Sequence, residues 1–184
     1  MHPDSPFSET SAWVQNRGAA CTTASSLIAL GLLRVPDLPP LGPATQALGA
    51  AQEYGAPGLL DYLSLPGRRA PIDLRLERLA AERGVAVRAH TGLVLPGWPL
   101  RIRPGEVLVA HLAWGQEKPG TYGTWGFSLL RPRTWSTGGH SVVVLAADGG
   151  GWTVLDPNHE GIQEWPRPGV AVTRTRLSSV AVGN

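Results

Sequence analysis

The sequence is poor in cysteine, and this scarcity excludes two classes of small protein. Among its 184 residues only Cys21 is a cysteine, so no internal disulfide framework can form. A cysteine-rich zinc site is excluded as well, because such sites use roughly two to four thiolates. Histidine and acidic residues do not cluster at the spacing of metal ligands either. We therefore expect a chain that needs no metal and no other cofactor.

Lysine is scarce too, and positive charge is not concentrated anywhere. Of the 16 basic residues only Lys118 is a lysine, and the arginines are scattered rather than grouped in a basic run. Proteins that bind nucleic acid usually carry a denser basic patch, so the charge pattern argues against a nucleic-acid partner.

Long apolar runs are absent. No stretch approaches the ~18 consecutive apolar residues of a membrane-spanning helix. Residues 1–12 have neither the basic start nor the apolar centre of a signal peptide. We expect a cytoplasmic protein with no membrane partner, and the sequence does not indicate an oligomeric state.

The composition that remains is that of a globular domain. An apolar content of 42% over this length fits a single domain spanning residues 1–184, with polar residues 1–12 as a loose arm. Helical periodicity and capping signals are confined to the first half of the chain. They predict helices over residues 21–33, 44–54 and 73–83, and a short helical turn over residues 59–63.

The first of these helices carries the cysteine at its start. Within residues 21–33, Ala24, Leu27 and Ile28 recur on one face at the helical period, and Ser25 lies elsewhere. This pattern is typical of an amphipathic helix.

Strand patterns dominate the second half. Alternating or buried apolar segments predict strands over residues 85–90, 106–114, 141–146, 152–156 and 170–176. The sequence Asp-Gly-Gly-Gly at residues 148–151 predicts a hairpin between two of them. Because helices come first and strands follow, we expect an α+β fold in which N-terminal helices pack on a C-terminal antiparallel sheet.

The cysteine and three other residues have the types that thiol chemistry requires. A thiol at a helix start has its thiolate favoured by the helix dipole. His140 begins a predicted strand and can act as the base, and Asp156 ends the next strand and can orient the imidazole. The backbone N–H of Cys21 and the side-chain amide of Gln15 can together bind an oxyanion.

Other residues compete for two of these roles. His111 and His159 are rival bases, but His111 lies in an apolar strand, as core histidines do, and His159 follows a polar turn. Asp156 can also be an ordinary turn residue before Pro157. Asn158 is the second choice as the group that orients the base.

The order of these residues resembles the papain-like cysteine peptidases, and among them the C39-like family. The matching segments are Gln15 with Cys21 six positions later, residues 107–114 of a predicted strand, Gly-His140-Ser-Val-Val-Val and Leu-Asp156-Pro. The resemblance implies an α+β papain-like fold, hydrolysis of a peptide or related amide bond in a peptide or protein substrate, and no cofactor. It implies Cys21 as nucleophile, His140 as base, Asp156 as its orienter and Gln15 as oxyanion donor.

The chain departs from the family at two points. Thr22 stands where the family usually has glycine after the cysteine, and residues 115–139 replace a short link before the histidine. Trp125 and Trp135 in that insertion are candidate substrate contacts. Transfer of the acyl group to an amine, and a catalytically silent domain that binds peptides, are the alternative functions.

Overall fold

The computed structural model describes just over half of the chain. The described residues are 12–16, 20–42, 45, 69–94, 99–114, 138–148, 150–166 and 172–180. Several predicted features lie wholly or mostly outside them: residues 1–11 of the arm 1–12, most of the helix 44–54, the turn 59–63, and residues 115–137 of the insertion 115–139 with Trp125 and Trp135.

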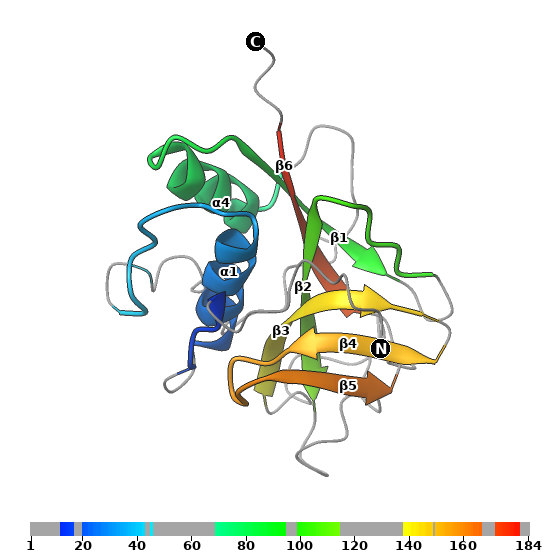
Figure 1. The fold of residues 1–184 in the computed structure, drawn as a ribbon. Coiled ribbons are helices and arrows are strands. Elements are labelled where there is room, and N and C mark those ends of the chain that lie inside the picture. Colours follow the sequence, from blue (N-terminus) through cyan, green and yellow to red (C-terminus); the bar gives the residue numbers. More distant parts are fainter. Residues whose placement is uncertain are drawn as a thin grey trace.

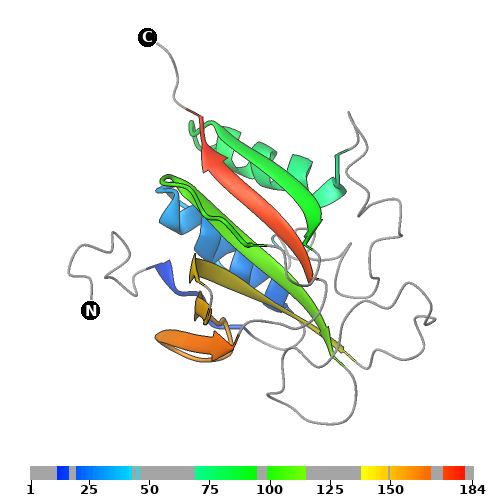
Figure 2. The same ribbon diagram turned by 90° about the vertical axis from the view of Figure 1, so that its right-hand side faces the viewer.

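The described residues form an α+β structure, which confirms the predicted class. Two helices lie on one side of a six-stranded antiparallel sheet with the strand order β1-β6-β2-β3-β4-β5 (Figures 1 and 2). The helices are α1 (Cys21–Leu32) and α4 (Pro71–Ala81). The strands are β1 (Val87–Val94), β2 (Glu106–Trp114), β3 (Gly138–Ala147), β4 (Gly151–Leu155), β5 (Ile162–Pro166) and β6 (Val172–Ser179).

Most predicted elements occur near their expected bounds. The strand predicted over residues 106–114 is β2. The helix predicted to begin at residue 73 begins two residues earlier at Pro71, because proline suits the first helical turn and Asp73 then caps the N–H of Ala70. Strand β5 was not predicted. It is an edge strand with an exposed Ile162, so it lacks a clear apolar alternation.

The prediction that α1 is amphipathic is wrong. Every residue from Cys21 to Leu30 is buried, and these residues include Thr22, Ser25 and Ser26. Two of these polar residues, Thr22 and Ser25, face β3 rather than water. Ser25 Oγ donates a hydrogen bond to the carbonyl oxygen of Ser141 in β3 at 2.7 Å, so short hydroxyl side chains satisfy this helix–sheet contact.

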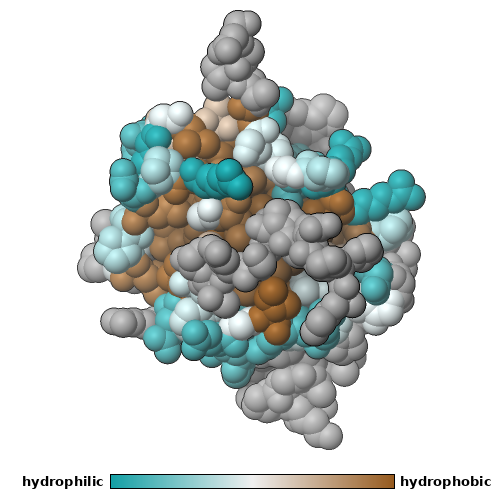
Figure 3. Space-filling model, in the orientation of Figure 1, coloured by the Kyte–Doolittle hydropathy of each residue, from teal (hydrophilic) through white to brown (hydrophobic). Residues whose placement is uncertain are grey.

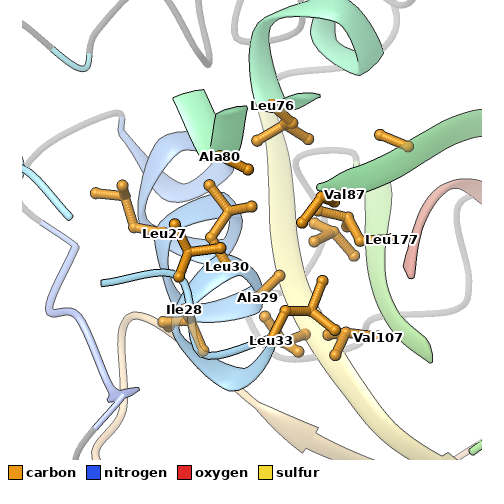
Figure 4. Packing of buried hydrophobic residues seen from close by; sticks show 14 of the residues in the cluster. Leu27, Ile28, Ala29, Leu30, Leu33, Leu76, Ala80, Val87, Val107 and Leu177 are labelled. Atoms are coloured by element: carbon orange, nitrogen blue, oxygen red, sulfur yellow. The ribbon is translucent and has the colours of Figure 1, made fainter. Parts of the chain in front are cut away.

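Two apolar clusters lie on opposite faces of the sheet. One fills the space between the helices and the sheet, where Leu27, Leu30, Leu76 and Leu177 meet (Figure 4). Each fully buried leucine contributes about 1.5–3 kcal/mol through burial of apolar surface. The second cluster, on the other face, includes Trp152 and Trp165.

The alternation of β3 explains why both faces are filled. Val143 points to the helix-side cluster, and Val142 and Val144 point to the other cluster. Seen from the side of Figure 1, apolar residues gather across the middle of the molecule and hydrophilic residues along its margins (Figure 3). Among the described helices, none is long and apolar enough to cross a membrane.

Candidate active site

Cys21, His140 and Asp156 come together where α1 begins beside the β3–β4 hairpin. Cys21 is the first residue of α1, His140 lies near the start of β3, and Asp156 directly follows β4. The hairpin is closed by Asp148, whose Oδ1 accepts hydrogen bonds from the N–H groups of Gly150 and Gly151 at 2.7 and 2.9 Å. Because β3 and β4 pair in antiparallel fashion, Asp156 after the end of β4 lies near His140 at the start of β3.

The imidazole of His140 is fixed by a short contact with Asp156. His140 Nε2 lies 2.7 Å from Asp156 Oδ1, and both side chains are almost completely buried, with 1% and 0% of their surface exposed. The other ring nitrogen, Nδ1, remains for the thiol of Cys21, with which His140 shares a hydrogen bond. This is the order nucleophile, base, orienter that thiol catalysis requires.

The electrostatics of the three groups favour an ion pair at rest. Burial acts to raise the pKa of Cys21, but the hydrogen bond and charge of His140 outweigh it and hold the pKa below its ordinary value. Burial acts to lower the pKa of His140, but hydrogen bonds to Asp156 and Cys21 raise it to about 9. Thiolate and imidazolium therefore coexist between these two pKa values.

Asp156 is held in place from several sides. Burial acts to raise its pKa, but the hydrogen bond and charge of His140 outweigh this effect, so the carboxylate form is favoured. The backbone N–H of Asn158 donates to Oδ1 at 2.8 Å, and the indole N–H of Trp13 donates to the Asp156 carbonyl oxygen at 3.0 Å. Among described residues, Oδ2 has no hydrogen-bond partner, so His140 is the main counter-charge of the carboxylate.

Gln15 lies in a segment that the structure ties to this site. Its own side chain is exposed. The next residue, Asn16, donates its backbone N–H to the Pro157 carbonyl oxygen and its side-chain amide to Asn158 Oδ1, both at 2.7 Å. These bonds hold residues 13–16 against the turn that follows Asp156. The sequence did not single out Asn16, because nothing in its local pattern marks a partner 142 positions away.

The geometry separates the rival residues from the three-residue site. His111 is hydrogen-bonded through both ring nitrogens to Ser141 and Thr175, and burial lowers its pKa to about 3. His159 is exposed. Asn158 bonds to Asn16, and it is Asp156 that contacts His140.

Trp165 is a site residue that the sequence did not predict. Its ring stacks on His140 with a centroid separation of 6.4 Å and an interplanar angle of 30°. It comes from β5, the unpredicted strand, and only 8% of its surface is exposed. The sequence carried one signal for this strand, because the apolar residues Ile162 and Trp165 stand between Gly161 and Pro166. The indole therefore packs against the base, and it belongs to the apolar cluster that includes Trp152.

Comparisons with known proteins add no further assignment. A scan against protein-family models, a search of curated proteins and a search of solved structures found no match. In the part of the chain that the structure describes, no group of three or more His, Cys, Asp or Glu side chains is arranged to hold a metal ion.

Proposed function

We propose that this protein is a thiol hydrolase with a papain-like fold, resembling the C39-like cysteine peptidases, that cleaves a peptide or related amide bond. One observation carries the proposal: a cysteine at a helix start shares a hydrogen bond with a buried histidine whose far nitrogen lies 2.7 Å from a buried aspartate. Helices packed on one face of an antiparallel sheet support the fold assignment.

The first half of the reaction forms a thioester. The Cys21 thiolate attacks the carbonyl carbon, and the carbonyl π-electron pair moves to oxygen. The backbone N–H of Cys21 and the side chain of Gln15 bind this oxyanion. The imidazolium of His140 then gives its proton to the departing amine nitrogen as the C–N bond breaks.

The second half releases the acid. A water molecule attacks the thioester carbon while His140 takes its proton, and the C–S bond breaks. The thiolate and the imidazolium are restored. Throughout, Asp156 keeps the ring oriented and stabilises its positive charge.

The test uses a library of peptides of defined sequence, with cleavage detected by mass spectrometry. The wild-type protein should cleave a subset, and Cys21→Ala should cleave none while unfolding at nearly the same temperature. Equal cleavage by Cys21→Ala would refute the mechanism. Addition of an amine acceptor separates two outcomes: free acid supports hydrolysis, and an amide conjugate as the main product would replace the proposal with acyl transfer.

A further inference from the structure

A row of buried polar side chains, with the half-buried His111 among them, crosses the sheet from the start of α1 to the start of α4. Four strands that lie side by side, β1, β6, β2 and β3, contribute one residue each, and each helix contributes one (Figure 2). The members of this polar row are Thr22, Ser141, His111, Thr175, Thr91 and Asp73. None of these side chains has a place in the reaction steps above.

The sheet register creates the row. Thr91 and Thr175 are direct partners between β1 and β6, and His111 and Ser141 are direct partners between β2 and β3. Each follows or precedes a helix-side core residue by two positions, so all four point to the face that the helices cover.

The hydrogen bonds of the row are continuous. Thr91 Oγ1 donates to Asp73 Oδ1 at 2.6 Å, and Thr91 Oγ1 lies 2.8 Å from Thr175 Oγ1. His111 Nε2 lies 3.0 Å from Thr175 Oγ1, and its Nδ1 lies 2.9 Å from Ser141 Oγ. At the other end, Ser141 Oγ lies 2.8 Å from Thr22 Oγ1.

The carboxylate at one end fixes the direction of every donor. Asp73 only accepts, so the single hydroxyl proton of Thr91 goes to it. Thr175 must then donate to Thr91, and its oxygen accepts from His111 Nε2–H. Burial keeps His111 neutral, with a pKa of about 3, so Nδ1 is an acceptor.

The same logic reaches the residue beside the thiol. Because His111 Nδ1 accepts, Ser141 donates to it, and Thr22 donates to Ser141. Yet Thr22 directly follows Cys21, and a hydrogen bond from its side chain is one of the causes that lower the pKa of Cys21, so the hydroxyl also serves as a donor to the thiolate. A hydroxyl has one proton, so donation to Ser141 and donation to the sulfur exclude each other.

We propose that Thr22 is a positioning residue for Cys21, and that the polar row, anchored on Asp73, sets where its hydroxyl proton points. The inference rests on the proposed role of Cys21 as a thiolate nucleophile. When Cys21 carries its proton as a thiol, the row draws the Thr22 proton toward Ser141. When the thiolate forms, Thr22 turns its proton to the sulfur and gives up the bond to Ser141. The row therefore opposes formation of the thiolate to a small extent.

The first measurement is the tautomer of His111 in the wild-type protein, read from the ¹⁵N shifts of its ring nitrogens. The row requires a proton on Nε2 and none on Nδ1. A proton on Nδ1 would overturn the inference, and this measurement needs no variant.

The second measurement breaks the row three hydrogen bonds away from Thr22. In Thr175→Val, His111 Nε2–H would have no acceptor, so the proton moves to Nδ1 and is donated to Ser141. Ser141 then no longer requires the Thr22 proton. We expect alkylation of Cys21 by iodoacetamide at about pH 6 to become roughly threefold faster. Thr175→Ser keeps the hydroxyl and should behave like the wild type.

The third measurement removes the hydroxyl beside the thiol. Thr22→Val should slow the alkylation about fivefold, because the thiolate loses a charge-assisted hydrogen bond, and Thr22→Ser should restore it. In the Thr22→Val background, Thr175→Val should have no further effect. An undiminished effect of Thr175→Val in that background would overturn the inference. If Thr175→Val does not fold, the inference is tested by the His111 tautomer in the wild-type protein and by the alkylation rates of Thr22→Val and Thr22→Ser.

None of these readouts uses a substrate, so they separate this inference from the proposed function. If the protein cleaves no peptide but shows the expected tautomer and alkylation rates, the proposed function is refuted and the role of Thr22 is supported. If the protein cleaves peptides but His111 carries its proton on Nδ1, the proposed function is supported and the role of Thr22 is refuted.

Discussion

Asp156→Asn should shift the titration of His140 by more than two pH units. The wild-type pKa of His140 is about 9, although burial alone acts to lower it, because Asp156 and Cys21 stabilise the imidazolium. Asparagine keeps the size of the side chain but removes its charge. The pKa of His140 should then fall by more than two units, which at ~1.4 kcal/mol per unit is a loss of at least about 3 kcal/mol of imidazolium stabilisation, while Cys21 still supports part of it.

Loss of the imidazolium also acts on the thiol. The charge of His140 is one reason why the pKa of Cys21 is low, so the thiolate should form at higher pH in Asp156→Asn. Two probes follow the two groups: ¹³C–¹H shifts of the His140 ring, and the ultraviolet absorbance of the thiolate. Because Cys21 is the only cysteine in the sequence, the thiolate signal belongs to it alone. Coupled groups titrate as a pair, so both probes should be fitted together.

Asp148→Asn is the matched control. It makes the same chemical change at the far end of the same hairpin, where Asp148 is exposed and closes the turn. This variant should leave both titrations at their wild-type positions. A His140 ring that still titrates near 9 in Asp156→Asn would refute the assignment of Asp156 as the main source of the shift.

Three further outcomes follow from the site. Trp165→Ala should lower the free energy of unfolding by about 3 kcal/mol in chemical denaturation and reduce the rate of peptide cleavage. Trp165→Phe should recover most of the stability and most of the rate. A wild-type rate in Trp165→Ala would argue that the stacked ring plays no part in cleavage. Gln15→Ala should reduce kcat by about 10²–10³-fold while iodoacetamide alkylation of Cys21 stays unchanged, since an oxyanion donor acts only on bound substrate; a parallel loss of alkylation would mean that Gln15 supports the thiol. Asn16→Ala removes the bond to Asn158 and should lower kcat/KM through Gln15 without moving the thiolate titration, and a shifted titration would contradict this route.

The sequence allowed a good prediction of the hairpin that carries the site. The glycine-rich turn and the apolar segments on either side of it predict two paired strands, so the approach of His140 and Asp156 follows from local pattern. The arrival of Cys21 beside them was anticipated from the resemblance to a family, because local pattern does not say where a helix packs.

The features that could not be predicted from the sequence depend on how distant strands pair and in which register. Thr91 and Thr175 meet because β6 lies between β1 and β2, and no local periodicity contains that information. The burial of the polar side of α1 was missed for a similar reason: Ser25 resembles a solvent-facing residue until its partner Ser141 is known. Trp165 was missed because an edge strand carries a weak alternation.

The position of β6 in the sheet has a consequence for biosynthesis. Ribosomes deliver the chain from its N-terminus, and β6 is the last of the described strands to emerge, yet its place is between β1 and β2. Until residues 172–180 are available, β1 has no neighbour in the sheet and the edge of β2 has unpaired N–H and C=O groups. A nascent chain therefore carries Cys21 before the sheet is complete, and the thiol meets His140 and Asp156 only after both residues have left the ribosome.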